Sequence, residues 1–185
     1  MAVVDPDFRS AAVEEISSSA GAARNVVRRR QLPLEAMASF DEALNTAFAY
    51  WQSKRQGGLL PSRKDIDVLE IAKLIKNTHL VDVSAADPKE WCFRIVGSII
   101  PQNWEWGSGR DKLIDCPWPA YKDMLFQDYG TVKATGVPMY HELVITVDWL
   151  EYQYARVVMP LADDGRQVDT LMSCVFHRPV PDLDG

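Results

Sequence analysis

The sequence predicts an α+β fold with five strands, a pair followed by a meander of three, and with helices before the pair and between the two groups. Two observations lead to this prediction. Residues 139–149, 152–161 and 168–177 alternate between apolar and polar side chains, and a period of two is typical of antiparallel strands. Elsewhere apolar side chains recur every three or four residues, which is the spacing of amphipathic helices. Asp163-Asp164-Gly165 indicates a hairpin between the last two strands, because Gly165 can adopt a positive φ at little cost.

The composition indicates one globular domain and argues against several kinds of partner. The chain has 185 residues, of which 47% are hydrophobic, and a formal net charge of −6. A negative charge argues against a nucleic-acid partner. No apolar run approaches the ~20 residues of a membrane span, and the N-terminus lacks the order of a signal peptide. Cys92, Cys116 and Cys174 are widely spaced without a CxxC motif, so we expect reduced thiols in a cytoplasmic protein and no metal site.

Residues 1–33 are rich in Ala, Ser and Arg and contain few large apolar side chains. Because such a segment buries little apolar surface, we expect a mobile N-terminal tail. The domain itself is expected to span residues 34–185. The run Arg28-Arg29-Arg30 is interpreted as a solvated charge run, with a phosphate or membrane-surface patch as the alternative.

A first helix is predicted after residue 34, because five apolar side chains follow one another at spacings of three and four: Met37, Phe40, Leu44, Phe48 and Trp51. Gly57-Gly58 ends this helix. A second helix is predicted to begin at Ser62 or Asp65, since either side chain can cap it, and Ile71 belongs to its apolar face.

The pair of strands follows at residues 78–84 and 91–97. Glycine and proline residues then interrupt the chain, so only short helices fit at first. A longer helix is predicted from about Tyr121 to Val132, and Gly136 stops it.

This order of elements resembles the PAS-domain superfamily. The residues are similar to a bacterial branch in which stand-alone single PAS domains carry a leading helical extension, and the similarity covers residues from about 50 to 177. Three motifs carry the resemblance in this order: Pro61-Ser62-Arg63 followed by Asp65 and Asp67, then Phe93-Arg94-Ile95-Val96-Gly97, and finally Met159-Pro160-Leu161. The chain departs from that branch after Gly97, where a turn of small residues is usual and this sequence has Trp104 and Trp106.

The resemblance implies a PAS-like five-stranded antiparallel sheet with helices across one face and a pocket between them. It also implies a non-catalytic sensory or signalling module that binds a small ligand or a protein partner. The signal is expected to pass to a separate output protein. PAS domains commonly dimerise through a helix before the sheet, so the stripe of the first helix is suited to a homodimer. Packing of the stripe on its own sheet is the alternative.

We expect neither haem nor flavin in this pocket. The cysteine that reacts with flavin in the superfamily stands in an Asn-Cys-Arg motif, and Cys116 has no such context. Haem needs an axial ligand, most often a histidine. His141 is the histidine of this sequence that can point into a cavity, and a histidine at a strand end is more often a hydrogen-bonded residue than an axial ligand.

The predicted cavity lies between the middle helices and the sheet. Its expected walls combine aromatic, aliphatic and polar side chains: Trp104, Trp106, Tyr121, His141, Leu143 and Ile145. Arg94 is the strong cation expected nearby, and a guanidinium that binds carboxylates bidentately favours a small organic acid as the ligand. The alternative is that Arg94 is structural and pairs with an acidic neighbour such as Asp67.

Two other functions stay open on the sequence. An NTF2-like α+β cone enzyme uses a His/Asp pair in a hollow sheet on a small organic substrate, and His141, Glu142 and Asp148 are candidates for such chemistry by default. A protein-interaction scaffold without a ligand is the third function. A coloured preparation indicates a cofactor, and turnover indicates an enzyme. The absence of both colour and turnover favours metabolite sensing or scaffolding.

Overall fold

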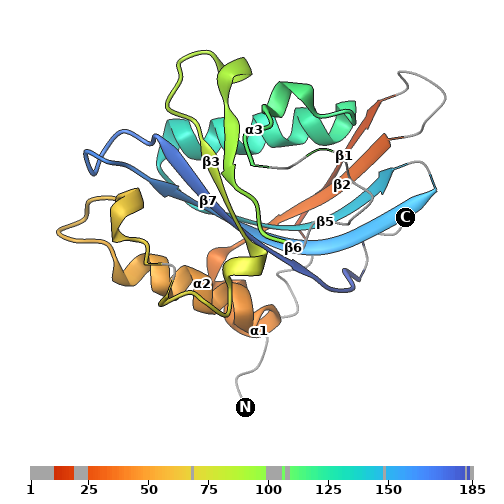
Figure 1. Cartoon of the computed structure of the whole chain (residues 1–185). Helices are drawn as coiled ribbons and strands as arrows, with labels where there is room; N and C mark the ends of the chain where they lie inside the picture. Colours follow the sequence, from red (N-terminus) through yellow and green to blue (C-terminus); the bar gives the residue numbers. More distant parts are fainter. Residues whose placement is uncertain are drawn as a thin grey trace.

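Seven strands form one antiparallel sheet in the part of the chain that the computed structural model describes, residues 11–18, 25–67, 69–98, 106, 109–147, 149–181 and 183. The strands are β1 Val13–Ser18, β2 Asn25–Leu32, β3 Thr78–Asp82, β4 Cys92–Ile95, β5 Met139–Val147, β6 Leu150–Leu161 and β7 Thr170–His177. Their order in the sheet is β1-β2-β5-β6-β7-β3-β4. The predicted α+β class is therefore confirmed, and the five predicted strands lie side by side as β5-β6-β7-β3-β4 (Figure 1).

The predicted number of strands is wrong, because the hairpin of β1 and β2 adds two strands beside β5. All eight residues of β2 pair with β5, and Val27 stands opposite Ile145 in the middle of this pairing. Val27 is fully buried. The expectation of a mobile tail is consequently wrong for residues 13–18 and 25–32, which are part of the sheet.

The three consecutive arginines of β2 alternate between the two faces of the sheet, and each binds a carboxylate. Arg28 pairs with Glu15 at 3.1 Å, and Arg30 pairs with Glu142 at 2.6 Å on the same face. Arg29 points to the opposite face. The Arg30 side chain is 1% exposed, so the interpretation of this run as a solvated charge run is wrong.

Helices cover both faces of the sheet. Figure 1 shows α3 (Pro119–Thr135) above the sheet, and α1 (Met37–Phe40) with α2 (Glu42–Ser53) below it. The resemblance implied helices across one face, and here the leading helices bury the second face as well. Both rows of side chains along β6 are accordingly buried from Tyr154 to Leu161.

The helix α3 matches the predicted helix of the middle segment. Its buried side chains recur at helical spacing: Ala120, Met124, Leu125, Asp128, Tyr129 and Val132. The helix ends at Gly136, which has a φ of 66° and donates its N–H to the carbonyl of Val132 at 2.9 Å. A side chain is strained at such a φ, so glycine suits this helix end.

The apolar stripe of the first predicted helix packs on its own sheet. Met37, Leu44 and Trp51 are fully buried there, and the indole N–H of Trp51 donates to the carbonyl of Pro160 on β6 at 2.8 Å. Phe40 and Phe48 are half-buried. The expected helix is also divided into α1 and α2 at Asp41, whose φ of −146° lies outside the helical region.

The second predicted helix is wrong as an α-helix. Residues 69–74 form turns between two short 3₁₀ helices, η3 (Arg63–Asp65) and η4 (Ile75–Asn77). The capping prediction is confirmed for η3, because Ser62 and Asp65 form a capping box in which the carboxylate of Asp65 accepts the Ser62 N–H at 2.7 Å. This reciprocal cap satisfies backbone donors of a single turn, and the turn is therefore stable without continuing into a longer helix.

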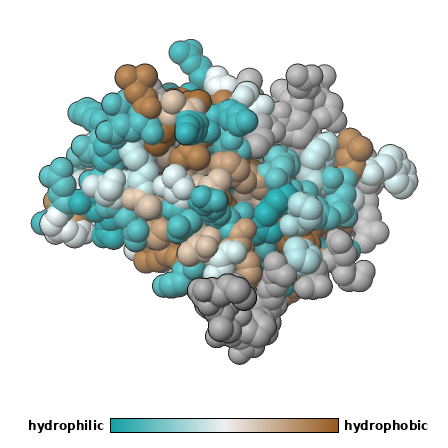
Figure 2. All heavy atoms as spheres, turned by 90° about the horizontal axis from the view of Figure 1, so that it is seen from below, coloured by the Kyte–Doolittle hydropathy of each residue, from teal (hydrophilic) through white to brown (hydrophobic). Residues whose placement is uncertain are grey.

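The face that α1 and α2 present to solvent is mixed in character. Figure 2 shows this side of the molecule, and hydrophilic side chains cover most of it with hydrophobic ones between them. Among the helices of the described residues, none has the length and apolar character that crossing a bilayer requires.

Candidate functional site

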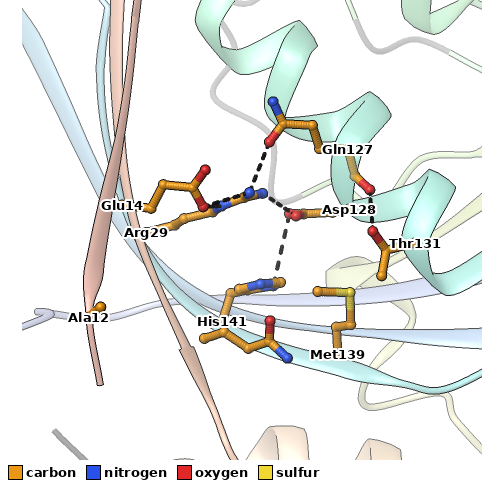
Figure 3. Close-up of a pocket in the computed structure, with 9 residues that line it drawn as sticks. Ala12, Glu14, Arg29, Gln127, Asp128, Thr131, Met139 and His141 are labelled. Atoms are coloured by element: carbon orange, nitrogen blue, oxygen red, sulfur yellow. Dashed lines mark hydrogen bonds and ion pairs between the residues drawn. The ribbon is translucent and has the colours of Figure 1, made fainter. Parts of the chain in front are cut away.

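A pocket of about 250 Å³ lies between the β1–β2 hairpin, α3 and β5. Its lining is mostly polar: Ala12, Glu14, Arg29, Gln31, Gln127, Asp128, Thr131, Met139 and His141 (Figure 3). The sheet positions follow from the strand register, because Glu14 stands opposite Arg29 and Gln31 stands opposite His141. Side chains that pair directly across antiparallel strands point to the same face, so the hairpin and β5 supply one continuous wall opposite α3.

A buried charge cluster forms the back of this pocket. Asp128 of α3 is 1% exposed and accepts hydrogen bonds from two guanidinium groups, those of Arg29 and Arg156. Arg29 also donates to the carboxylate of Glu14 at 2.9 Å and to the side-chain oxygen of Gln127 at 2.9 Å. Arg29 therefore joins both strands of the hairpin to α3.

Arg156 lies behind Asp128, on β6, and is fully buried. Burial alone disfavours its charged form, but the adjacent carboxylate of Asp128 raises the pKa of Arg156 above its usual value. Within the described part of the chain its Nε and Nη1 atoms have no hydrogen-bond partner, and its guanidinium carbon lies 5.7 Å from the ring centre of Tyr129. The guanidinium thus keeps its charge in the interior through one carboxylate and one aromatic face.

His141 lies on the wall beside Asp128 and is 1% exposed. Burial lowers the pKa of His141 to about 4, although the carboxylate of Asp128 opposes that effect. The ring is therefore neutral at pH 7. Its Nδ1 atom lies 3.9 Å from Oδ2 of Asp128, which is too long for a hydrogen bond, and it has no hydrogen-bond partner among the residues that the structure describes. His141 is thus a buried polar residue on the pocket wall, and its Nδ1 atom faces Asp128 without a hydrogen bond to it.

A second polar cluster occupies the opposite face of the sheet. Arg178, which follows β7, binds Asp41 and Glu142 at 2.7 Å each, and Tyr140 donates its hydroxyl to Asp41 at 2.5 Å. Burial and this hydrogen bond raise the pKa of Tyr140. Because Arg30 also binds Glu142, this cluster fastens the C-terminal segment to the hairpin and to the junction of α1 and α2, away from the pocket.

Of the predicted site residues, the structure places His141 in the pocket. Trp106, Leu143 and Ile145 are buried in the hydrophobic core under α3, and Tyr121 packs against that core with its ring centre 6.3 Å from that of Trp106. These four do not line the pocket. Trp104 lies outside the described residues.

Arg94 is not in the pocket either. Its side chain is 58% exposed on β4 and binds the carboxylate of Asp82 on β3 at 2.5 Å. Asp82 raises the pKa of Arg94. The structural alternative for Arg94 is thus observed, with Asp82 as the partner in place of Asp67.

Arg29 and Asp128 are the functional candidates that the sequence analysis missed. Arg29 was missed because the sequence analysis interpreted the whole run Arg28-Arg29-Arg30 as solvated. Asp128 carried a usable signal, because it stands between Leu125 and Val132 on the apolar stripe of α3. A carboxylate on the buried face of a helix requires a cationic or hydrogen-bonding partner from elsewhere in the fold.

The cysteine thiols of the described residues show no sign of reactivity. Burial raises the pKa of Cys116 to about 12, so this thiol packs as an apolar group. Cys174 is also buried. Within the described ranges, no group of three or more His, Cys, Asp and Glu side chains is arranged to hold a metal ion.

The two buried histidines predict a pH-dependent stability. Burial lowers the pKa of His79 and of His141 from 6.5 to about 4, so below pH 6.5 the unfolded chain binds protons that the folded chain does not. Their contribution is complete above pH 6.5 and is lost as the pH falls towards 4, by about 2 kcal/mol per histidine between pH 6.5 and 5. Urea denaturation at several pH values measures it. His79→Asn keeps an acceptor for the Gly97 N–H and should remove about half of this loss; an unchanged pH slope contradicts the assignment.

Comparison with known proteins gives one match. Residues 39–102 match the family model described as PAS domain. The matched range includes α2, β3 and β4, and it ends before α3. The search of curated proteins and the search of solved structures found no match.

Proposed function

The chain belongs to the PAS-domain superfamily, and from this premise we propose that it is a non-catalytic sensory module that detects a small molecule in the pocket between the hairpin, α3 and β5. PAS domains serve in general as sensory and signalling modules. In this proposal the ligand is a small molecule, and the signal passes to a separate output protein.

The observation that carries the proposal is the buried His141 side chain, whose Nδ1 has no hydrogen-bond partner among the described residues, on the wall of a pocket whose charged groups are held by ion pairs. Ligand sites typically combine a concave wall with a few polar groups held in place before the ligand arrives. Asp128 is held here by two guanidinium groups, and the neutral His141 ring lies beside it.

The same geometry supports a role without catalysis. A general base needs a free lone pair and a pKa near the working pH. Asp128 is engaged by Arg29 and Arg156, and the pKa of His141 is about 4. An NTF2-like enzyme and a ligand-free scaffold are the alternatives. Turnover of a substrate favours the enzyme, and the absence of any stabilising ligand favours the scaffold.

The position of the pocket supports a route for the signal. From the hairpin region Ala12, Glu14, Arg29 and Gln31 line the pocket, and α3 and β5 supply the rest of its wall. The segment that matches the family model contains α2, β3 and β4 instead. A ligand in the pocket contacts the hairpin and α3 together, so its binding stabilises one arrangement of these two elements over others. We propose that the output protein, or a second copy of this chain bound through the half-buried Phe40 and Phe48, reads that arrangement.

The test is a thermal-shift screen of a metabolite library with a pair of matched variants. A ligand at 100 times its dissociation constant stabilises the folded state by about 2.7 kcal/mol. Thr131 and Thr135 are both exposed on α3, and each donates its hydroxyl to a backbone carbonyl four residues earlier at 2.8 Å, but only Thr131 lines the pocket. We expect Thr131→Trp to fill the pocket and abolish the shift, and Thr135→Trp to keep it.

Two results contradict the proposal. If the screen gives no stabilising compound for the wild type, the scaffold function is favoured. If a compound stabilises Thr131→Trp as much as Thr135→Trp, the ligand binds elsewhere in the molecule.

A further inference from the structure

We propose that the pocket is specific for a small carboxylic acid, and that Glu14 occupies the place of the ligand carboxylate on Arg29 while the pocket is empty. This inference rests on the proposed function, because it names the ligand class and the internal competitor of the same site.

The charges around the pocket leave room for one further anion. Arg29 and Arg156 both bind Asp128, so two guanidinium groups share a single buried carboxylate. His141 adds no charge at pH 7, since its pKa is about 4. Glu14 is the second carboxylate on Arg29, and its side chain is 55% exposed. The two positive charges of Arg29 and Arg156 are therefore neutralised by the buried Asp128 together with Glu14 at the surface. A ligand anion can replace Glu14 in this role.

The contact between Glu14 and Arg29 uses one oxygen of the carboxylate. Nε and Nη2 of Arg29 both approach Oε2 of Glu14, at 2.9 Å and 2.8 Å. A guanidinium edge presents two parallel N–H donors, which a carboxylate matches best with both of its oxygens. Glu14 is tied to the backbone of β1 and meets this edge with one oxygen, whereas a free acid can turn to use two.

Displacing Glu14 is easy compared with displacing Asp128. An ion pair with an exposed partner contributes little to stability, and β1 is an edge strand from which the Glu14 side chain can turn into water. Asp128 is 1% exposed and binds two guanidinium groups, so its removal leaves buried charges unpaired. An incoming carboxylate consequently replaces Glu14 and leaves the back of the pocket unchanged.

The remaining wall describes the rest of the ligand. Nδ1 of His141 has no hydrogen-bond partner in the described ranges, and a neutral imidazole nitrogen can donate or accept one hydrogen bond. Ala12 and Met139 supply apolar surface, and the pocket volume of about 250 Å³ admits a small molecule. The geometry suits an acid that carries a hydroxyl or carbonyl group besides its carboxylate, such as a hydroxy acid or an oxo acid.

The experiment compares two neighbouring glutamates. Glu14 and Glu15 are adjacent on β1, both are exposed, and each pairs with an arginine of β2, but Glu15 does not line the pocket. The probes are lactate and pyruvate, with lactamide as the uncharged counterpart, and binding is measured by calorimetry at low and high salt. We expect Glu14→Gln to bind the acids at least fivefold more tightly than the wild type, and Glu15→Gln to bind them as the wild type does.

A second substitution tests the other side of the contact. Arg29→Lys keeps the positive charge beside Asp128 but lacks the two parallel donors, so we expect acid binding at least tenfold weaker with the fold retained. Arg28→Lys is the matched control, because Arg28 points to the opposite face and pairs with Glu15. Its affinity for the acids should equal that of the wild type.

Several outcomes overturn the inference without touching the proposed function. They are equal binding of lactamide and lactate, weaker acid binding by Glu14→Gln, and the same gain in Glu14→Gln and Glu15→Gln. Failure of both acids to bind wild type and Glu14→Gln overturns it as well. In each case a neutral compound whose stabilising effect Thr131→Trp abolishes still supports a ligand in this pocket.

Discussion

Replacing Asp128 by asparagine is expected to lower the free energy of unfolding by about 3–5 kcal/mol, the range for breaking a buried ion pair from one side. The substitution keeps the size of the side chain and removes its charge. Arg156 is fully buried and has no second carboxylate within salt-bridge distance among the described residues. Its guanidinium charge is therefore left unpaired away from water. Urea denaturation followed by tryptophan fluorescence measures the change.

Asp123 provides the control on the same helix. Its side chain is exposed, so Asp123→Asn should change the free energy of unfolding by no more than about 0.5 kcal/mol. A second substitution tests the cause: combining Asp128→Asn with Arg156→Met removes the unpaired charge and should recover more than half of the loss. A loss below about 1 kcal/mol for Asp128→Asn alone, or no recovery in the double variant, contradicts the assigned role of the cluster.

The strands that the sequence predicts correctly are those whose signals are local. The strands β5, β6 and β7 each extend over eight or more residues that were predicted from the pattern of neighbouring side chains. The turn before β7 contains Gly165, whose φ of 75° is the positive value that the hairpin prediction requires. The end of α3 at Gly136 is equally local. Each of these features can be found within a short window of sequence because backbone geometry limits which residues fit.

The hairpin of β1 and β2 could not be predicted in this way. Its strand β2, which lies between β1 and β5, places arginines on both faces. A charged residue on a strand usually indicates a solvated face. Arg30 is buried because Glu142, 112 residues later, lies opposite it. Arg29 is held by Asp128, 99 residues away. Partners at such separations are a property of the folded chain, and neither residue identifies the other in the sequence.

The candidate site was predicted in part for the same reason. The alternation along β5 correctly placed His141, Leu143 and Ile145 on one face, but it does not tell which part of the strand is covered by core side chains. The structure buries Leu143 and Ile145 under α3 and leaves His141 on the pocket wall. Arg94 binds Asp82 because the pairing of β3 with β4 brings the two residues together, and that register is also set by residues far apart in the sequence.

Removing residues 1–32 is expected to prevent the chain from folding. Val26, Val27 and Leu32 are buried in the sheet, and burying each of them stabilises the fold by about 1.5–3 kcal/mol. Their sum is comparable with the whole stability of a typical domain, about 5–15 kcal/mol. The truncation also exposes the edge of β5 and removes Arg29 and Arg30 from their buried carboxylates.

Circular dichroism and amide proton NMR spectra of residues 33–185 measure the outcome of this truncation. Two point variants of the full-length chain test whether the buried side chains of the hairpin are needed for folding. Val27→Asp places an unpaired charge at a fully buried position and should unfold the full-length chain. Val13→Asp is the matched control in the same hairpin, because Val13 is exposed on the edge strand β1, and it should melt within a few degrees of the wild type.

If residues 33–185 give a dispersed spectrum and a melting temperature near that of the whole chain, the hairpin is an attached segment and the remaining five strands form the complete folding unit. Because β2 pairs along its full length with β5 and supplies the arginines for two buried carboxylates, we expect the opposite result.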